Sequence, residues 1–577
     1  TTLLAINTYS PWKFHKGAYY IVYEFTLDIM GIALLTGLLW ALGRRMLAKP
    51  KSLTSNFVDF HAIYLLLTLT ITGFILEAAR MNVNPKPFDT SAPIGYWLSA
   101  YLPTITPNSY IALWWIHAVL VFYFIIIVPR LRLRHIIYAI FSTSGANYRN
   151  PLGRLPTIPI EEVEQTGKIG VEKPSEYTRW HLMSLDACME CGRCTEVCPA
   201  WNAGKVLNPK KVVQDIRSAL YTDSSVAESV SEEALWQCTT CNACVEACPV
   251  LIRHVDLIVD ARRFLVAEGK LSGTAATVLR QSQSTRSAWG ISSDEREKWM
   301  ENENIPLVRD CISKGEKFDV LFWIGCAGAC DPNAIKVVKS VSALLKKANV
   351  NFACLGKEES CTGDPARRIG DEFLFQELAQ QNIATFENYG VKTIITTCPH
   401  CFNTFKNEYP EFEGNYDVYH HSQYLSHLVQ KGILKTPELE NGKYTIHDPC
   451  YLGRVNEEID APRKTIGVHS NKNRYETPLG ALINEEIDKQ NTLIEPQHNG
   501  RKTLCCGAGG GRMWMEEEPN QRPAVRRLKE LSQTGADTVV VACPFCRIML
   551  DASLNQAESS KQLRLVDIAE VLREANK

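Results

Sequence analysis

Two runs of cysteines in this chain share one unusual spacing. Each run reads Cys-x2-Cys-x2-Cys-x3-Cys and ends in proline; the runs comprise Cys188, Cys191, Cys194 and Cys198, then Cys238, Cys241, Cys244 and Cys248. Three thiolates spaced this closely can bind three irons of one 4Fe–4S cube, and the proline turns the chain so that the fourth cysteine reaches the other cube. Paired cysteines also bind zinc, but a zinc site does not require this spacing twice over. The pattern predicts two clusters, held by Cys188, Cys191, Cys194 and Cys248 and by Cys198, Cys238, Cys241 and Cys244.

The C-terminal half, about residues 318–577, contains an internal repeat with its own cysteines. The first copy contributes Cys326, Cys361, Cys398 and Cys401, and the second contributes Cys450, Cys505, Cys506, Cys543 and Cys546. The offset of 37 positions from Cys361 to Cys398 recurs from Cys506 to Cys543. Each copy alternates β-branched runs with amphipathic segments. This predicts paired α/β lobes with cysteines at strand ends, where such folds bind ligands.

The glycine-rich segment 507–511 resembles a phosphate-binding loop only superficially. It lacks the Lys-Ser/Thr that follows such a loop and comes directly after two cysteines, so we interpret it as a turn that permits close approach to a cluster. His447, three residues before Cys450, is expected to be a structural hydrogen-bonding residue near the cluster rather than a ligand. The cysteines outside the repeat are expected to be ordinary thiols: Cys311, Cys330 and Cys354.

The N-terminal part of the chain is strongly apolar, unlike the remainder. Three segments are long enough to cross a bilayer, namely 18–42, 58–78 and 109–129. The first runs into an arginine pair and lacks a small-residue cleavage site, so it is not expected to be a cleaved signal. A shorter apolar piece, 93–103, is bounded by prolines and is expected to be a loop or re-entrant element.

Basic residues set the expected orientation of these spans. Four basic residues follow the first span: Arg44, Arg45, Lys49 and Lys51. Three follow the last span: Arg130, Arg132 and Arg134. The loop between the second and third spans has only two, Arg80 and Lys86. The positive-inside rule then puts the N-terminus outside and the cysteines in the cytoplasm. A reducing compartment suits twenty cysteines grouped for metals rather than for disulfides. We therefore expect a protein of the prokaryotic cytoplasmic (inner) membrane.

Histidines inside membrane helices indicate ligands, because polar groups are costly there. His117 and His135 are 18 positions apart, which is five helical turns, so we expect them on one face at opposite ends of one helix. His61 should lie at the depth of His135, which predicts a bis-histidine haem b between these two. The alternative to haem ligation is that His135 lies at the membrane interface with its ring directed to water, and that His61 forms a hydrogen bond between helices. His15 is the histidine that could join His117 in a second haem.

Length and charge bound the remaining possibilities. A net charge of −1 argues against a nucleic-acid-binding protein, and 577 residues are too many for one ordinary core. We expect a multidomain chain with an α-helical transmembrane anchor, a helical dicluster ferredoxin module and a duplicated α/β cysteine-rich (CCG) domain. The expected boundaries are 1–145 for the anchor, 146–180 for a linker, 181–280 for the dicluster module, 281–317 for a second linker, and 318–440 and 441–577 for the repeats.

Each part resembles a known family. The helical spacer between the cysteine runs is similar to the dicluster modules of succinate dehydrogenase and heterodisulfide reductase subunits. The repeats resemble the cysteine-rich domain of heterodisulfide reductase, in which five cysteines hold a non-cubane 4Fe–4S centre. The resemblance implies such a centre at Cys450, Cys505, Cys506, Cys543 and Cys546. In the first repeat Ser360 replaces one cysteine, so the four remaining thiolates imply an ordinary cubane, although a serine can also ligate.

The anchor resembles the haem-carrying gamma subunit of respiratory nitrate reductases. That family has a histidine pair on each of two helices, the second histidine of one helix lying ten residues after the first. Here position 71 is isoleucine, so an outer haem requires His15 as a substitute.

The full order of parts resembles the membrane-bound iron–sulfur oxidoreductases that oxidise electron-transfer flavoprotein and reduce menaquinone. The motifs that carry this resemblance are CTGDPARRIG at 361–370, HDPCYLGR at 447–454 and CCGAGGGRMWMEE at 505–517. In that family the first copy normally keeps its adjacent cysteine pair. The resemblance implies that electron-transfer flavoprotein, or another soluble flavoprotein, donates electrons near the catalytic five-cysteine centre. These electrons would then pass through the cubanes to haem b and quinone. Two alternatives are a disulfide reductase acting through Cys505 and Cys506, and a relay subunit of a larger respiratory assembly.

Overall fold

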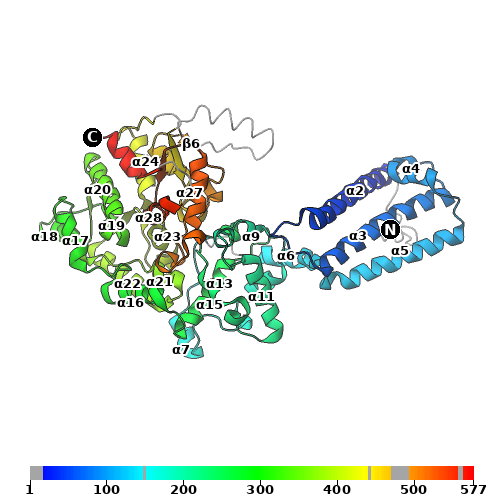
Figure 1. Ribbon diagram of the computed structural model, residues 1–577, viewed down its shortest axis with the longest axis horizontal. Coiled ribbons are helices and arrows are strands. Elements are labelled where there is room, and N and C mark those ends of the chain that lie inside the picture. Colours follow the sequence, from blue (N-terminus) through cyan, green and yellow to red (C-terminus); the bar gives the residue numbers. More distant parts are fainter. Residues whose placement is uncertain (1–16, 147–150, 440–442, 469–492, 557–562) are drawn as a thin grey trace. The chain divides into compact units, whose positions relative to one another are not determined.

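The computed structural model describes residues 17–146, 151–439, 443–468, 493–556 and 563–577 (Figure 1). The chain divides into two compact units. The first comprises the N-terminal part to Phe141 together with Asp186–Gly192, and the second comprises Ser142–Leu185 and Arg193–Lys577. His15 lies outside the described residues.

The first unit is built on three long apolar helices, α2 (Gly17–Gly43), α3 (Phe57–Val83) and α5 (Pro107–Ile127). All three are long and apolar enough to cross a membrane, and short turns extend α2 through η1 (Arg44–Ala48) and α5 through η3 (Val128–Arg130). Their outward side chains are mostly large and apolar, as a lipid-facing surface requires. The predicted transmembrane anchor is confirmed, with somewhat longer spans than the sequence indicated.

Most of the segment 93–103 is helical, so the expected loop is wrong, and the alternative of a re-entrant element stays a prediction. After the turn η2 (Asp89–Ser91), helix α4 (Pro93–Tyr101) begins with proline at its first position, where a missing N–H costs nothing. The next two N–H groups, of Ile94 and Gly95, donate to the Asp28 carboxylate of α2 at 2.7 and 3.2 Å. A buried carboxylate from a neighbouring helix therefore caps α4, which sequence spacing alone does not reveal.

The helix that was expected to carry both His117 and His135 is interrupted. Helix α5 ends at Ile127, and Pro129 and the extended backbone of Leu131 separate it from η4 (Arg132–Arg134) and α6 (His135–Gly145). Proline lacks the N–H that would continue the helix, and its ring clashes with the preceding turn. The placement of both histidines on one face of one helix is therefore wrong, and the five-turn spacing does not apply.

The second unit is helical around both cysteine runs. Helices α9 (Arg193–Glu196) and α10 (Pro199–Asn202) belong to the first run, α14 (Ala243–Glu246) belongs to the second, and α11 (Pro209–Thr222), α12 (Val226–Val230) and α13 (Glu232–Trp236) lie between them. The other helices before the first sheet are α7 (Ile160–Thr166), α8 (Arg179–Asp186, ending in the first unit), α15 (His254–Ala267), α16 (Gly273–Thr285), α17 (Ser293–Glu301) and α18 (Val308–Ser313). No strand occurs among the described residues from 151 to 319, as the helical module predicts.

Two four-stranded parallel sheets follow with the same topology. The first has the order β2-β1-β3-β4, from β1 (Val320–Trp323), β2 (Phe352–Ala353), β3 (Thr393–Thr396) and β4 (Asp417–His420). The second has the order β6-β5-β7-β8, from β5 (Tyr444–His447), β6 (Leu493–Ile494), β7 (Thr538–Val541) and β8 (Arg564–Asp567). The central strands are largely buried, and β3 and β7 are β-branched runs, as suits strands covered on both faces. The duplicated α/β fold is confirmed.

Short and long helices cover these sheets and carry the cysteine loops. In the first repeat they are α19 (Gly325–Cys330), α20 (Pro332–Lys347), α21 (Asp364–Ile369), α22 (Glu372–Tyr389), α23 (Pro399–Asn403) and α24 (His421–Gln430). In the second they are α25 (Asp460–Thr465), α27 (Pro523–Gln533), α28 (Pro544–Asp551) and α29 (Ile568–Glu574).

Removing the carboxylate that caps α4 should loosen the anchor. We expect Asp28→Ala to leave two N–H groups without an acceptor and to cost about 1–2 kcal/mol. Asp28→Asn, which keeps one acceptor oxygen, should recover most of that loss. The measurement is the apparent unfolding temperature in detergent, and equal temperatures for the alanine variant and the unmodified protein would contradict the cap.

Candidate iron–sulfur centres and haem ligands

The five cysteines of the second repeat converge at the carboxyl ends of its strands. Cys450 follows β5, Cys543 caps α28 directly after β7, and Cys546 lies in the first turn of that helix. Cys505 and Cys506 come from the loop after η10 (Gly500–Lys502). All five are buried. Their thiols form a connected series of hydrogen-bonding contacts, from Cys450 to Cys505, Cys506, Cys546 and Cys543.

The chemistry of this donor set fits an iron–sulfur cluster. Hydrogen bonding with Cys505, together with burial, holds the pKa of the Cys450 thiol well above its usual value. Contacts with Cys506 and Cys543, with burial, do the same for the Cys546 thiol. The hydrogen bonds that Cys505 accepts from Cys241 and Cys450 lower the pKa of the Cys505 thiol, so the set pairs protonated thiols with thiols that ionise more readily, and metal binding replaces the protons that remain. Because none of the five forms a disulfide, all can act as thiolate ligands.

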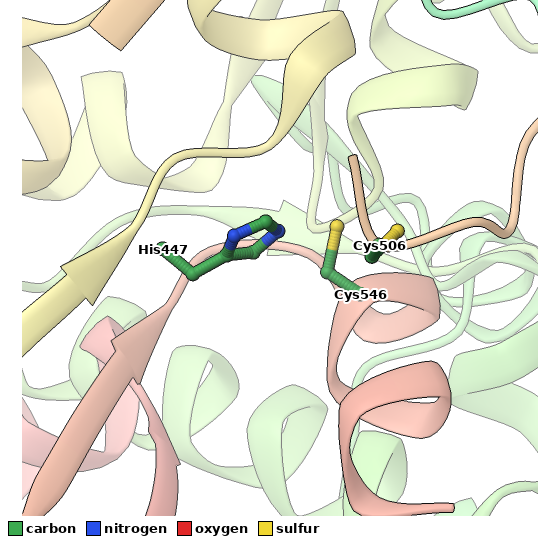
Figure 2. Close-up of side chains that lie close together, drawn as sticks. All are labelled: His447, Cys506 and Cys546. Atoms are coloured by element: carbon green, nitrogen blue, oxygen red, sulfur yellow. The ribbon is translucent and has the colours of Figure 1, made fainter. Parts of the chain in front are cut away.

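His447 lies beside this group, as the sequence indicated. A ring nitrogen of His447 and the sulfurs of Cys506 and Cys546 all lie within 4.8 Å of one another. Figure 2 shows the imidazole at the end of its strand with its ring directed toward the two sulfurs. Burial and the neighbouring Arg527 lower the pKa of His447 to about 3.

The four cysteines of the first repeat occupy equivalent places. Cys326 lies in α19 after β1, and Cys398 and Cys401 begin α23 after β3, while Cys361 follows η6 (Gly356–Glu358). All four are buried. Hydrogen-bonding contacts join Cys326 to Cys361 and Cys398 to Cys401. The structure therefore brings together the four thiols that the sequence assigned to one cluster.

Ser360, which stands where a fifth cysteine would be, is directed to another partner. Its hydroxyl donates to the Asn382 side-chain oxygen at 2.8 Å. The amide nitrogen of Asn382 in turn donates to the Cys361 carbonyl at 3.0 Å and to the Tyr409 hydroxyl at 3.0 Å. This buried network uses the serine as a structural donor, which favours a site of four thiolates.

The three groups of cysteines in the second unit adjoin one another. The Cys398 thiol of the first repeat contacts the Cys543 thiol of the second. The Cys505 thiol contacts the Cys241 thiol of the second ferredoxin-type run. The sulfurs thus form one series from the first repeat through the second to the dicluster module. Sequence reasoning missed this adjacency because it depends on how the modules pack.

Glycines in the segment 507–511 make this packing possible. A Cβ atom on Gly509 would lie 2.3 Å from the Thr239 carbonyl oxygen, and one on Gly510 would lie 2.2 Å from that of Cys238. The segment therefore permits close approach, as we interpreted it, but to the backbone of the second cysteine run. The high glycine content of segment 507–511 was the feature of the sequence that indicated a close contact.

The second cysteine run and Cys198 form a buried site of their own. A small cavity is lined by Cys198, Cys238, Cys241 and Cys244, the four residues that the spacing assigned to one cluster. The N–H of Thr240 donates to the Cys238 sulfur at 3.4 Å, and Thr240 has a positive φ of 49°. Burial is the main cause that holds the pKa of the Cys244 thiol well above its usual value. A cluster at these thiols replaces their protons with metal.

The first cysteine run is shared between the two units. Cys188 and Cys191 belong to the first unit, and Cys194 and Cys248 belong to the second, so their assignment to one cluster stays a prediction from the spacing. Within the first unit, the loop from Cys188 to Cys191 is tied to the helix ends. Glu190 between them forms an ion pair with Arg132 at 2.7 Å, and Arg132 reaches Asp59 at 2.9 Å.

The backbone of this loop mirrors that of its counterpart in the second run. Glu190 has a positive φ of 56°, at the position that Thr240 occupies in the second run. Gly192 packs so closely on Ser52 that a Cβ atom would lie 2.5 Å from the Ser52 carbonyl oxygen. The side chains of the two positions differ, since Thr240 hydrogen-bonds the Tyr451 hydroxyl at 3.0 Å whereas Glu190 pairs with Arg132. The same loop geometry therefore serves two different contacts.

The three described histidines of the anchor each have one ring nitrogen engaged. The Nδ1 of His117 bonds the Thr72 hydroxyl at 2.8 Å, and the Nδ1 of His135 bonds the Arg132 carbonyl at 2.7 Å. An axial histidine usually binds iron through one nitrogen while the other is held by a hydrogen bond. His117 and His135 fit that arrangement through Nε2. His61 instead uses Nε2, toward the Tyr123 hydroxyl at 3.1 Å, so it would have to turn or bind through Nδ1.

Family comparisons agree with the domain architecture. Residues 320–406 and 444–551 match the family model described as Cysteine-rich domain, and residues 184–252 match the one described as 4Fe-4S dicluster domain. Together with the membrane helices and the buried thiols, these matches define the class of the protein: a membrane-anchored iron–sulfur oxidoreductase.

Relatives narrow the class to a family. The chain is 31% identical to the EtfAB:quinone oxidoreductase of Syntrophomonas wolfei, an alignment that covers 99% of this chain and 85% of that protein. It is 32% identical to the probable iron-sulfur-binding oxidoreductase FadF of Bacillus subtilis, over 97% of this chain and 84% of that one. The chain belongs to the family of these two oxidoreductases. A subunit of the dihydromethanophenazine:CoB–CoM heterodisulfide reductase of Methanosarcina barkeri is 27% identical over 69% of this chain and 95% of that protein.

A methyl group at Gly510 should separate the glycine-rich segment from the second cysteine run. We expect Gly510→Ala to destabilise by several kcal/mol, because the 2.2 Å approach adds to the cost of a non-glycine residue at φ +67°. Gly535→Ala is the matched control, since its φ of +81° carries the same backbone cost with no atom within 4 Å. Thermal unfolding of the two variants measures the difference, and equal losses would contradict the close contact.

Ser360 should be dispensable for metal in the first repeat. We expect Ser360→Ala to keep the full iron content and cluster absorbance, because its hydroxyl serves Asn382 rather than a metal. Cys361→Ser at the adjacent position should lower the iron content. Iron and acid-labile sulfide analysis of both variants makes the comparison, and equal losses from both would assign Ser360 to the ligand set.

Proposed function

We propose that this protein oxidises reduced electron-transfer flavoprotein at its cysteine-rich half and reduces menaquinone in the membrane. The observation that carries the proposal is the unbroken series of buried thiols from Cys398 and Cys543 through Cys505 to Cys241. Similarity to the EtfAB:quinone oxidoreductase of S. wolfei along nearly the whole chain supports the choice of donor and acceptor. The second repeat holds a non-cubane 4Fe–4S centre in this proposal, and the other three cysteine sites hold cubanes.

The clusters and haem b supply one-electron redox chemistry, and the polypeptide sets their spacing and surroundings. Four buried thiols and the Thr240 N–H hold the site beside Cys505. Buried cations lie near the same sulfurs. Arg454 donates to the carbonyls of Cys241 and Thr503, at 3.0 and 2.5 Å, and so joins the second run to the second repeat. Positive charge and N–H donors near thiolates favour the reduced, more negative form of a cluster.

On the membrane side, the loop that carries Cys188 and Cys191 is the exit in this proposal. Glu190 and Arg132 hold this loop against the start of α3, through Asp59. The carbonyl oxygen of Arg132 also accepts a hydrogen bond from Nδ1 of His135. His61 lies two residues after Asp59 in the sequence. In this proposal His135 and His61 would hold a haem b next to this loop, and the haem would supply one-electron transfer toward quinone. The proposal holds with one haem or with two, and His117 and His15 would hold the second.

The proposed orientation follows the basic residues. Arg44, Arg45, Arg130 and Arg134 cluster at the helix ends that carry the Cys188 loop, so these ends face the cytoplasm and the N-terminus faces outside. Reduction of menaquinone to menaquinol takes up two electrons and two protons. Electron-transfer flavoprotein in its two-electron-reduced form supplies both electrons and loses both flavin protons to the medium.

A second candidate function is a quinol-linked disulfide reductase. The observation that favours it is the complete five-cysteine set at Cys450, Cys505, Cys506, Cys543 and Cys546, and the 27% identity to the reductase subunit of M. barkeri supports it. A relay subunit without activity of its own is the third possibility, and it requires partner subunits for turnover.

The assay that separates these functions uses the detergent-purified full chain under anaerobic conditions. Reduced electron-transfer flavoprotein with a water-soluble menaquinone analogue should give continuous flavin oxidation. Dithionite-reduced protein mixed with the disulfide of coenzymes M and B should stay reduced. Flavin oxidation that never exceeds the protein-free rate, with rapid reoxidation by the disulfide, would contradict the proposal and favour the reductase.

Weakening the ion pair at the Cys188 loop should slow electron exit. Glu190→Gln removes one charge from the contact with Arg132 and should loosen the loop by about 1–3 kcal/mol. We expect slower haem reduction by the flavoprotein, with unchanged cluster content. The control is Glu228→Gln, at an exposed glutamate of the same module. Haem absorbance in stopped-flow reports the rate, and equal rates in both variants would contradict this role of Glu190.

A further inference from the structure

We propose that His447 donates its Nε2–H to the thiolate sulfurs of Cys506 and Cys546 and does not ligate iron, with Arg527 fixing the tautomer. The proposal deepens the proposed function and rests on the cluster assigned there to the second repeat. It names His447 as a positioning residue, because it acts on the centre through the ligand sulfurs.

The tautomer follows from the side of the ring that faces Arg527. The Nε of Arg527 lies 3.0 Å from the Nδ1 of His447, and both side chains are buried. A guanidinium nitrogen always carries hydrogen and can only donate. The His447 Nδ1 must therefore offer a lone pair. The single hydrogen of the neutral ring then sits on Nε2.

Arg527 is held so that it cannot turn away from this contact. One terminal nitrogen donates to the His498 carbonyl at 2.8 Å and to the Glu530 carboxylate at 2.5 Å. The other donates to the Ile446 carbonyl at 3.3 Å. A planar guanidinium anchored at all three nitrogens keeps the direction of its Nε–H.

On its other side, His447 faces sulfur. Its Nε2 is buried and has no hydrogen-bond partner among the residues that the structure describes. The same ring lies within 4.8 Å of the sulfurs of Cys506 and Cys546, with the ring directed toward them (Figure 2). A buried N–H without an acceptor is costly, and the thiolate sulfurs of a bound cluster are the acceptors within reach.

Iron ligation by His447 conflicts with this geometry. Binding a metal through Nε2 requires the lone pair there and moves the ring hydrogen to Nδ1. Two hydrogens, on Nδ1 and on the Arg527 Nε, would then face each other across 3.0 Å. If His447 donates from Nε2, both of its ring nitrogens have a suitable partner. If it ligates iron through Nε2, only Nε2 has one.

The first repeat supplies an independent parallel. Trp323 lies three residues before Cys326, as His447 lies three residues before Cys450, and both end the first strand of their sheet. The indole Nε1 of Trp323 is buried with no hydrogen-bond partner among the described residues. A hypothetical Cβ on Gly325 would lie 3.8 Å from this nitrogen and 3.9 Å from the Cys401 sulfur. An indole can donate but not ligate, and the same position in both repeats carries a buried nitrogen without a partner among the described residues.

The test compares three variants of the full-length protein by EPR-monitored redox titration. His447→Leu removes the donor, His447→Gln keeps an N–H, and His427→Leu is the control at an exposed histidine of α24. Hydrogen bonds to ligand sulfurs raise the potential of a cluster. We expect a lower midpoint potential of the second-repeat centre in His447→Leu, partial recovery in His447→Gln, and no shift in the control. Iron content should stay constant.

Electron–nuclear double resonance of the reduced protein separates the donor from a ligand. We expect one proton coupling that disappears in D2O and in His447→Leu, with a weak coupling from 15N-labelled histidine. A strong, directly bonded nitrogen coupling, or an unchanged potential in His447→Leu, would overturn the inference and leave the proposed function standing. If the unmodified protein shows no second-repeat signal at all, the cluster assignment in the proposed function fails and this inference fails with it.

Discussion

The buried guanidinium of Arg262 connects the three parts of the second unit that carry cysteines. Its nitrogens donate to the carbonyls of Leu235 and Cys238 beside the second run, of Arg368 in the first repeat and of Gly510 in the second. Burial lowers its pKa to about 10, which still leaves it charged at neutral pH. A buried charge is tolerated only when its hydrogens are all bonded. This one side chain therefore bonds to the backbone of all three parts that carry the cysteine groups.

That constraint has a direct consequence for electron transfer. The contacts of Cys398 with Cys543 and of Cys505 with Cys241 place the five-cysteine site between the first repeat and the dicluster module. A cluster proposed at this site would therefore be an intermediate in the series, not an end of it. A substrate that acts at such a cluster would have a further cysteine site on each of two sides. This arrangement suits a donor that delivers electrons one at a time as well as a disulfide that needs two.

The sequence predicted the parts of this protein better than their junctions. The cysteine spacings, the offset of 37 positions and the apolar runs fix local structure, so the dicluster module, the duplicated sheets and the three spans were all predicted correctly. The continuous helix from His117 to His135 was wrong, although Pro129 within that stretch was an available signal. The cap of α4 by Asp28 and the contact of Cys241 with Cys505 depend on tertiary packing. No pattern along the chain determines them.

The central claim, that electrons cross the cysteine series into the membrane, is tested most directly by rapid anaerobic mixing with reduced electron-transfer flavoprotein. Absorbance of the iron–sulfur clusters and the haem α-band are recorded in the same reaction. The account predicts cluster bleaching first, then haem reduction, and haem reoxidation when a menaquinone analogue is added. A haem that stays oxidised while the clusters are fully reduced would contradict it.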